Sequence, residues 1–172
     1  MYAHCDKLYS VLLIESKELH YYVKVDSEGY VRRGGFAMFY ISDDKKKIAP
    51  ESVMRLIRQT YWASNRPLDE ITVSIENSVC FGAYDSDNDE LIGFARVVTD
   101  FSTCYYLCDV IVDEGHRSNG IGKALVKAIT SDERFDRLEG LLITRDAHGL
   151  YSQYGFTGKD GIFMGRGLNS SL

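Results

Sequence analysis

The sequence predicts an α/β (α+β) fold in which helices flank a central sheet, and three observations support it. Apolar runs bounded by turn residues are typical of strands, and they fill residues 1–48 and return after residue 78. Apolar side chains at helical spacing follow Pro50 and Pro67, and proline is favoured at the first position of a helix. A further helical pattern follows a turn that carries Gly120 and Gly122.

Residues 1–48 are predicted to form a β extension packed on the core. Strands are expected over 8–15, 19–26 and 36–41, followed by an exposed connection over 42–47. The extension could lengthen the sheet, cover a cleft or mediate formation of a homodimer, and the sequence leaves these three roles open. Residues 49–172 are predicted to form the main domain.

The main domain is expected to mix helices and strands along its length. Helices are predicted over 50–62, 67–77, from residue 121 onward, and over 147–154. Strands are predicted over 79–84, 91–99, 105–112, 141–143 and 161–166. The strand over 141–143 is expected to be buried. The last helix is expected to have Asp146 as its N-cap and Gly155 as its C-cap.

Composition excludes several classes of protein. The net charge of −5 argues against non-specific binding of nucleic acid. No apolar run approaches the roughly 20 residues that cross a bilayer, and the first residues lack the pattern of a signal peptide. Cys104 and Cys108 lack the histidine or second cysteine pair of a zinc site. We therefore expect a cytoplasmic protein with no bound metal and with neither nucleic acid nor membrane as a partner.

The most informative segment runs from Val110 to Leu125. An apolar strand enters a turn that carries Arg117-Ser-Asn-Gly120-Ile-Gly122 at the start of a helix. Glycines at that spacing let several N–H groups point at one place, and a helix N-terminus adds about half a positive charge there. The segment therefore predicts a site for a phosphate or pyrophosphate group.

Two common nucleotide-binding motifs do not match this segment. A dinucleotide-binding loop requires a third glycine, where the chain has Leu125, and an acidic residue after the next strand, where it has Thr144-Arg145. A P-loop requires Gly-Lys-Ser/Thr, and the chain has Gly122-Lys-Ala124. No hydroxyl is therefore placed to bind magnesium.

A third motif does match. Arg117-x-x-Gly120-x-Gly122 between a strand and a helix resembles the acetyl-CoA pyrophosphate loop of the GNAT superfamily of N-acetyltransferases. Leu150-Tyr-Ser-Gln-Tyr-Gly-Phe156 resembles the closing element of the same family, and the resemblance covers about residues 50–165. It implies a mixed, mostly antiparallel sheet that is split between two parallel strands at the CoA site. It also implies an acyltransferase (EC 2.3.1) that moves an acetyl group from acetyl-CoA to a primary amine of a small molecule or peptide.

The resemblance assigns the residues that bind acetyl-CoA. Backbone groups of Val110, Ile111 and Val112 would pair with its pantetheine arm. The pyrophosphate would lie on N–H groups of the loop, those of Ser118, Asn119, Gly120, Ile121, Gly122 and Lys123. Arg117 is either a charge-assisted contact to the same group or an exposed turn residue.

The resemblance also implies that Tyr151 donates a proton to the departing CoA thiolate, since a phenol stays protonated at pH 7. The family spacing favours Tyr151 over Tyr154. The group that takes the proton of the amine is left open. Asp109 lies in an apolar strand, where an unpaired carboxylate is costly, so it is either the base or a structural carboxylate that anchors an arginine or a backbone amide. His148 and water are the remaining candidates for the base.

The resemblance implies that substrate-binding residues come from the first two helices, the loop between them and the central strands. Tyr61 and Trp62 could form an aromatic wall for a cation, with packing in the core as the alternative. Arg66 and Arg96 are either ligands of a substrate carboxylate or plain surface charges. The alternative function is a non-catalytic GNAT-fold module that binds acyl-CoA as a sensor or a partner-binding subunit.

Overall fold

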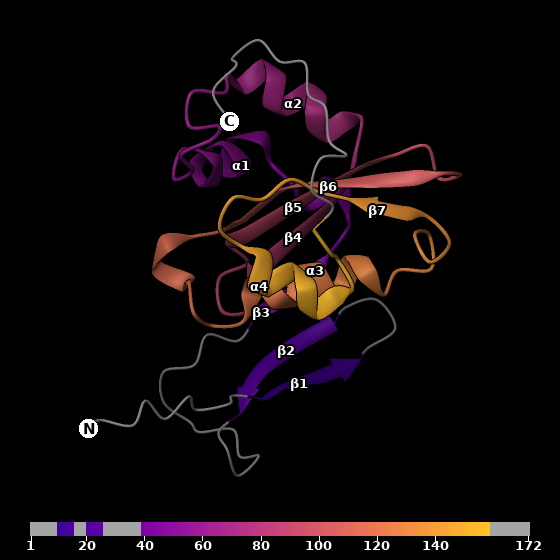
Figure 1. The fold of residues 1–172 in the computed structure, drawn as a ribbon. Coiled ribbons are helices and arrows are strands. Elements are labelled where there is room, and N and C mark those ends of the chain that lie inside the picture. Colours follow the sequence, from indigo (N-terminus) through magenta and orange to yellow (C-terminus); the bar gives the residue numbers. More distant parts are fainter. Residues whose placement is uncertain (1–9, 16–19, 26–38, 159–172) are drawn as a thin grey trace, which may run out of the picture.

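A seven-stranded sheet forms the centre of the computed structural model, which describes residues 10–15, 20–25 and 39–158 (Figure 1). The strands are β1 (Ser10–Glu15), β2 (His20–Val25), β3 (Phe39–Ser42), β4 (Val79–Asp85), β5 (Leu91–Thr99), β6 (Cys104–Val112) and β7 (Glu139–Leu141), and they lie in chain order across the sheet. Neighbouring strands are antiparallel except β6 and β7, which are parallel. The mixed, mostly antiparallel sheet is thus confirmed.

Helices cover both faces of this sheet. The pair α1 (Pro50–Ile57) and α2 (Leu68–Glu76) lies on one face, and α3 (Ile121–Thr130) with the short α4 (His148–Tyr151) lies on the other (Figure 1). Short 3₁₀ turns occupy Lys45–Lys47 (η1), Glu114–His116 (η2) and Ser152–Tyr154 (η3). The fold therefore has three layers, with the sheet in the middle.

Each face of the sheet has its own hydrophobic core. On the side of α3 the core includes Phe39, Phe81, Ile92, Leu107, Leu125 and Ile129. On the side of α1 and α2 it includes Tyr40, Val53, Leu56, Ile71, Phe94 and Ile111. Alternation along a strand sends neighbouring residues to opposite faces, so β3 contributes Phe39 to one core and Tyr40 to the other.

Strand β3 ties the predicted N-terminal extension to the main domain. It pairs with β4 in the register Phe39↔Asp85 to Ser42↔Gly82, and β2 and β1 continue the sheet beyond it. The added strands therefore lengthen the sheet, which is one of the three roles left open by the sequence. The boundary between residues 48 and 49 stays a prediction.

Helix α1 ends earlier than predicted. The periodicity predicted a helix to residue 62, but α1 ends at Ile57. The N–H groups of Gln59 and Thr60 bond to carbonyls three residues back, and the Thr60 hydroxyl also donates to the Ile57 carbonyl at 2.7 Å. These contacts tighten the chain into a turn, because a serine or threonine hydroxyl competes for helical carbonyls.

Three predictions for the C-terminal part of the chain need correction or lie outside the structure described. The strand predicted over 141–143 as buried is instead β7 at Glu139–Leu141, and Leu141 and Ile143 are about half exposed, at 45% and 47%. Asp146 does not cap α4, whose N-cap position is held by Ala147. The strand predicted over 161–166 lies outside the described residues.

The split between parallel strands is present. Pairing of β6 with β7 extends only from Cys104↔Glu139 to Tyr106↔Leu141, so the edge of β6 beyond Tyr106 has no strand partner among the described residues. On its other side β6 pairs with β5, with a bulge where Asp109 and Val110 oppose Ala95. Asp109 has a φ of 50°, which is uncommon for a residue other than glycine.

Candidate active site

The glycine turn lies directly between β6 and α3. Ser118 and Gly120 both have left-handed backbones, with φ values of 66° and 82°, so the chain turns sharply before the helix begins. The first helical hydrogen bond runs from the Ala124 N–H to the Gly120 carbonyl at 3.0 Å. The N–H groups of residues 121–123 thus have no helical partner and are available to a ligand. This geometry fits a phosphate or pyrophosphate group.

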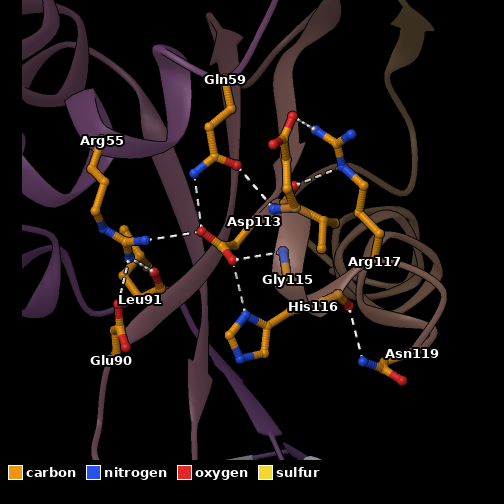
Figure 2. Close-up of polar contacts among 11 residues, drawn as sticks. Arg55, Gln59, Glu90, Leu91, Asp113, Gly115, His116, Arg117 and Asn119 are labelled. Atoms are coloured by element: carbon orange, nitrogen blue, oxygen red, sulfur yellow. Dashed lines mark hydrogen bonds and ion pairs between the residues drawn. The ribbon is translucent and has the colours of Figure 1, made fainter.

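Asp113 holds the start of this turn in place, as Figure 2 shows. Its carboxylate accepts hydrogen bonds from Arg55 Nη1 at 2.9 Å and Gln59 Nε2 at 3.0 Å, both of which come from the α1 region. It also accepts one from the Gly115 N–H at 3.1 Å and lies 3.0 Å from His116 Nδ1. Asp113 therefore joins α1 to the chain that leads into the glycine turn.

Two further contacts complete this anchor. The Gln59 Oε1 atom accepts a hydrogen bond from the Glu114 N–H at 2.9 Å, and Arg55 Nη2 donates to the Leu91 carbonyl at 2.6 Å (Figure 2). Partial burial opposes the charge of Asp113, but the hydrogen bonds and the Arg55 charge outweigh it and lower its pKa to about 2. The carboxylate is thus fully ionised near neutral pH.

The sequence did not single out this cluster. Asp113 follows an apolar strand, and a local turn in which its side chain bonds the Gly115 N–H can be expected from its residue type. Its partners Arg55 and Gln59 lie on a separate element, and no local spacing indicates the contact.

Arg117 folds back onto its own strand. Its Nε donates to the Val112 carbonyl at 3.3 Å, its Nη2 lies 3.5 Å from Glu114 Oε1, and its side chain is 53% exposed. The Val112 carbonyl is therefore engaged, which leaves the backbone groups of Val110 and Ile111 as the more open part of the predicted pantetheine edge.

Asp109 sits between two arginines at the bulge of β6. Arg66 donates to it through Nη1 at 2.7 Å and Nη2 at 3.2 Å, and Arg96 donates through Nε at 2.9 Å. Its side chain is only 5% exposed. Burial disfavours the charge, but the two guanidinium groups outweigh it and hold the pKa of Asp109 below its usual range. This geometry favours the structural alternative for Asp109, because a carboxylate so stabilised is a poor proton acceptor.

The contacts with Asp109 also show what the side chains of Arg66 and Arg96 bind. Arg96 also donates from Nη1 to the Ser78 hydroxyl at 3.1 Å. Both arginines are thus bound within the protein rather than offered at the surface, although Arg96 contributes to the floor of a groove of about 490 Å³ between α2 and β5. The groove is lined by Asp69, Glu70, Val73, Ser74, Asn77, Ser78, Arg96 and Val98.

Tyr151 lies at the end of α4, and its hydroxyl has no hydrogen-bond partner among the described residues. Burial raises its pKa to about 12, with smaller contributions from Asp146, Cys108 and Tyr106. The Tyr151 side chain packs against the core on the α3 side of the sheet, to which Tyr105 and Leu107 of β6 belong. Tyr154 differs, since its hydroxyl donates to the Lys123 carbonyl at 3.0 Å and so joins η3 to α3.

Two cysteines near the site are in the thiol form. Burial raises the pKa of Cys108 to about 12 and that of Cys80 to about 11. Only a thiolate is a strong nucleophile, so neither side chain is prepared to accept an acetyl group near neutral pH. This favours direct transfer to the acceptor over a covalent intermediate on the protein.

The aromatic pair Tyr61 and Trp62 is exposed, at 56% and 49%, which excludes the alternative of core packing. Their rings meet edge to face with centroids 4.9 Å apart. The guanidinium of Arg145 lies over the Tyr61 ring, with Cζ 4.1 Å from its centroid. His148 is exposed at the first position of α4.

Comparisons with known proteins agree with this architecture. The family model described as "Acetyltransferase (GNAT) domain" matches residues 76–158. A crystal structure of a putative acetyltransferase of the GNAT family from Xanthomonas campestris pv. campestris is 35% identical, with a TM-score of 0.71, and the match covers 78% of this chain and 96% of that one. An uncharacterized N-acetyltransferase of Gracilaria tenuistipitata var. liui is 29% identical over 103 residues, which are 56% of this chain and 57% of that protein.

The chain belongs to the GNAT family. The crystal structure from Xanthomonas carries this assignment, since the chain covers nearly all of it at 35% identity. The chain spans about half the length of the curated relatives it matches. Among the described residues, no helix is long and apolar enough to cross a membrane.

Proposed function

We propose that the protein is an acetyl-CoA-dependent N-acetyltransferase that transfers an acetyl group to a primary amine by direct attack. The observation that carries the proposal is the arrangement along β6. Its open edge leads at one end to the N–H groups of residues 121–123, while Tyr151 packs against the core to which the same strand contributes Tyr105 and Leu107. Membership of the GNAT family supports the same activity.

The loop fits the pyrophosphate of acetyl-CoA. A Cβ atom added at Gly122 would meet only Val112 at 3.7 Å and Leu150 at 4.0 Å, which are ordinary contacts, so packing within the protein does not require glycine there. The glycine instead leaves the helix N-terminus uncovered. We assign the pyrophosphate to the backbone of residues 118–123 and the pantetheine arm to the open edge at Val110 and Ile111.

Acetyl-CoA supplies an activated acetyl thioester at this site. The neutral amine attacks the carbonyl carbon, the new C–N bond forms, and the C–S bond breaks with its electron pair on sulfur. Tyr151 donates its phenolic proton to the departing sulfur, which leaves as the CoA thiol, and the phenolate then takes a proton from solvent. Because the pKa of Tyr151 is raised to about 12, the phenol keeps its proton through the neutral range.

Asp109 has a positioning role in this proposal. Its two arginine partners hold the bulge of β6 and bring Arg66, at the end of the α1–α2 connection, against the strand. The proton of the amine then passes to solvent or to His148, both of which the sequence left open.

Thiol release tests the proposal. The full chain is incubated with acetyl-CoA and a panel of primary amines, and free CoA is followed with a thiol-reactive dye. We expect amine-dependent release that falls strongly in Tyr151→Phe. Tight binding of acetyl-CoA without release for any amine, unchanged by Tyr151→Phe, would instead support the non-catalytic acyl-CoA-binding module.

A further inference from the structure

The contact between Arg145 and Tyr61 joins the α1–α2 connection to the β7–α4 connection. Tyr61 belongs to the α1–α2 connection, which also supplies Arg66 to Asp109. Arg145 belongs to the β7–α4 connection, which leads into α4 and Tyr151. The contact, with Arg145 Cζ 4.1 Å from the centroid of the Tyr61 ring, therefore links the connection that supplies Arg66 to the connection that leads into Tyr151.

The N–H donors of Arg145 are not used by any described residue. Its Cζ atom lies 4.1 Å from the centroid of the Tyr61 ring, so a cation–π contact rather than a hydrogen bond holds the guanidinium. Arg145 is exposed and forms no ion pair or hydrogen bond with any described residue. The ring thus orders the guanidinium without using its donors, which reduces the entropy lost when a planar anion binds.

The other arginines of the site are not free in this way. Arg66 uses two nitrogens on Asp109, and Arg96 is divided between Asp109 and Ser78. A substrate carboxylate could bind these two arginines only by displacing the buried carboxylate of Asp109. Arg145 forms no hydrogen bond or ion pair within the described part of the chain.

We propose that Arg145 binds a carboxylate of the acceptor, so that the acceptor is an aminocarboxylate, that is, a free amino acid or a close analogue. This inference rests on the proposed function and narrows its substrate class. The fork of a guanidinium matches a carboxylate in a bidentate geometry. The exposed faces of Tyr61 and Trp62 provide apolar contact for the carbon chain of the acceptor.

Matched pairs of amines test the carboxylate directly. Lysine with cadaverine, ornithine with putrescine, tyrosine with tyramine and alanine with ethylamine differ within each pair only by the carboxylate. We expect kcat/KM for thiol release to be about 10- to 100-fold higher for the carboxylated member of at least one pair, as a charge-assisted contact provides. Equal values within every active pair would overturn the inference and leave the proposed function standing.

Variants separate Arg145 from general charge effects. Arg145→Gln should remove the preference by raising KM for the carboxylated amine, with little change for its decarboxylated partner. Arg145→Lys should restore part of it, since an ammonium attracts a carboxylate without the fork. Arg137→Gln is the matched control, because Arg137 is another exposed arginine with no ion pair among the described residues.

Binding provides a readout that does not depend on turnover. Trp62 is the only tryptophan of the chain and touches Tyr61, so its fluorescence reports on this place. We expect the carboxylated amines to change the emission in the wild type and not in Arg145→Gln. If no amine releases CoA but this response is seen, the proposed function fails while the carboxylate site stands. If amines are acetylated and neither preference nor fluorescence depends on Arg145, the inference fails alone.

Discussion

Arg66 holds Asp109 with two hydrogen bonds, of 2.7 and 3.2 Å, at the one point where β6 bulges away from β5. The pair links the α1–α2 connection to the strand that forms one side of the split. Because the Asp109 side chain is 5% exposed, its charge is tolerated only while the arginines are present. The stability of the β6 bulge therefore depends on Asp109 and its arginine partners together.

Asp109→Asn should destabilise the fold by about 3 to 5 kcal/mol, because it leaves the charges of Arg66 and Arg96 with little compensation. Urea unfolding at pH 7 measures the change. Asp136→Asn is the control, since Asp136 is exposed and a surface substitution of this kind changes stability by about 0.5 kcal/mol or less. Equal stabilities for the two variants would contradict the buried ion pair.

Asp113→Asn should reduce stability at neutral pH and much less in acid. The folded protein lowers the pKa of Asp113 from 3.8 to about 2, so its stabilising contribution is present above pH 3.8 and is lost as the pH falls through about 2. At pH 7 the loss should be about 2 kcal/mol, the size expected for hydrogen bonds to a charged group. Unfolding midpoints at pH 7, 4 and 2 test this, and a difference that stays constant over that range would refute it.

Tyr151→Phe should lower kcat by about 100-fold, the scale of a lost proton donor, with little change in the affinity for acetyl-CoA. Burial raises the pKa of Tyr151 to about 12, so the wild-type rate should not decline with an apparent pKa near 10. Thiol-release kinetics between pH 6 and 10 give both results.

Tyr154→Phe is the matched control for this variant. It removes the hydroxyl that donates to the Lys123 carbonyl, so it should cost about 1 kcal/mol of stability and leave kcat near the wild-type value. If it lowered kcat as strongly as Tyr151→Phe, the assignment of the proton donor to Tyr151 would be wrong.

Local patterns in the sequence were sufficient for most of the elements and for the loop. Pro50 is the first residue of α1 as predicted, whereas Pro67 is the N-cap residue just before α2, and the two glycines indicated a sharp turn that the φ of Gly120 bears out. Each of these signals depends on the backbone preferences of one or two neighbouring residues. Helix starts and turns of this kind can therefore be predicted without knowing which residues pack against them.

Contacts between distant segments could not be read in this way. The apolar run over 141–143 favoured a buried strand, but the strand that forms is β7 at Glu139–Leu141. Gly140 makes room there for the Tyr105 ring, because a Cβ on residue 140 would lie 2.5 Å from the Tyr105 hydroxyl. The partners of Asp113, Asp109 and Arg145 likewise come from elements remote in sequence. The sequence therefore indicated candidate site residues. The tertiary structure showed which of these side chains are already bound to other residues of the protein.

Gly120→Ala and Gly122→Ala should affect stability in opposite directions although the chemical change is the same. Gly120 has a φ of 82°, where a side chain costs about 1 to 2 kcal/mol, so the first variant should be destabilised by that amount. Gly122 lies in the first turn of α3, where an added Cβ meets only ordinary contacts, so the second variant should be more stable by up to about 1 kcal/mol.

Gly120→Ala should also weaken acetyl-CoA binding at least 10-fold in calorimetry, because relief of the strain turns the N–H groups of the loop away from the pyrophosphate. Two variants destabilised alike would show that the loop is held by packing around both glycines rather than by the backbone of Gly120.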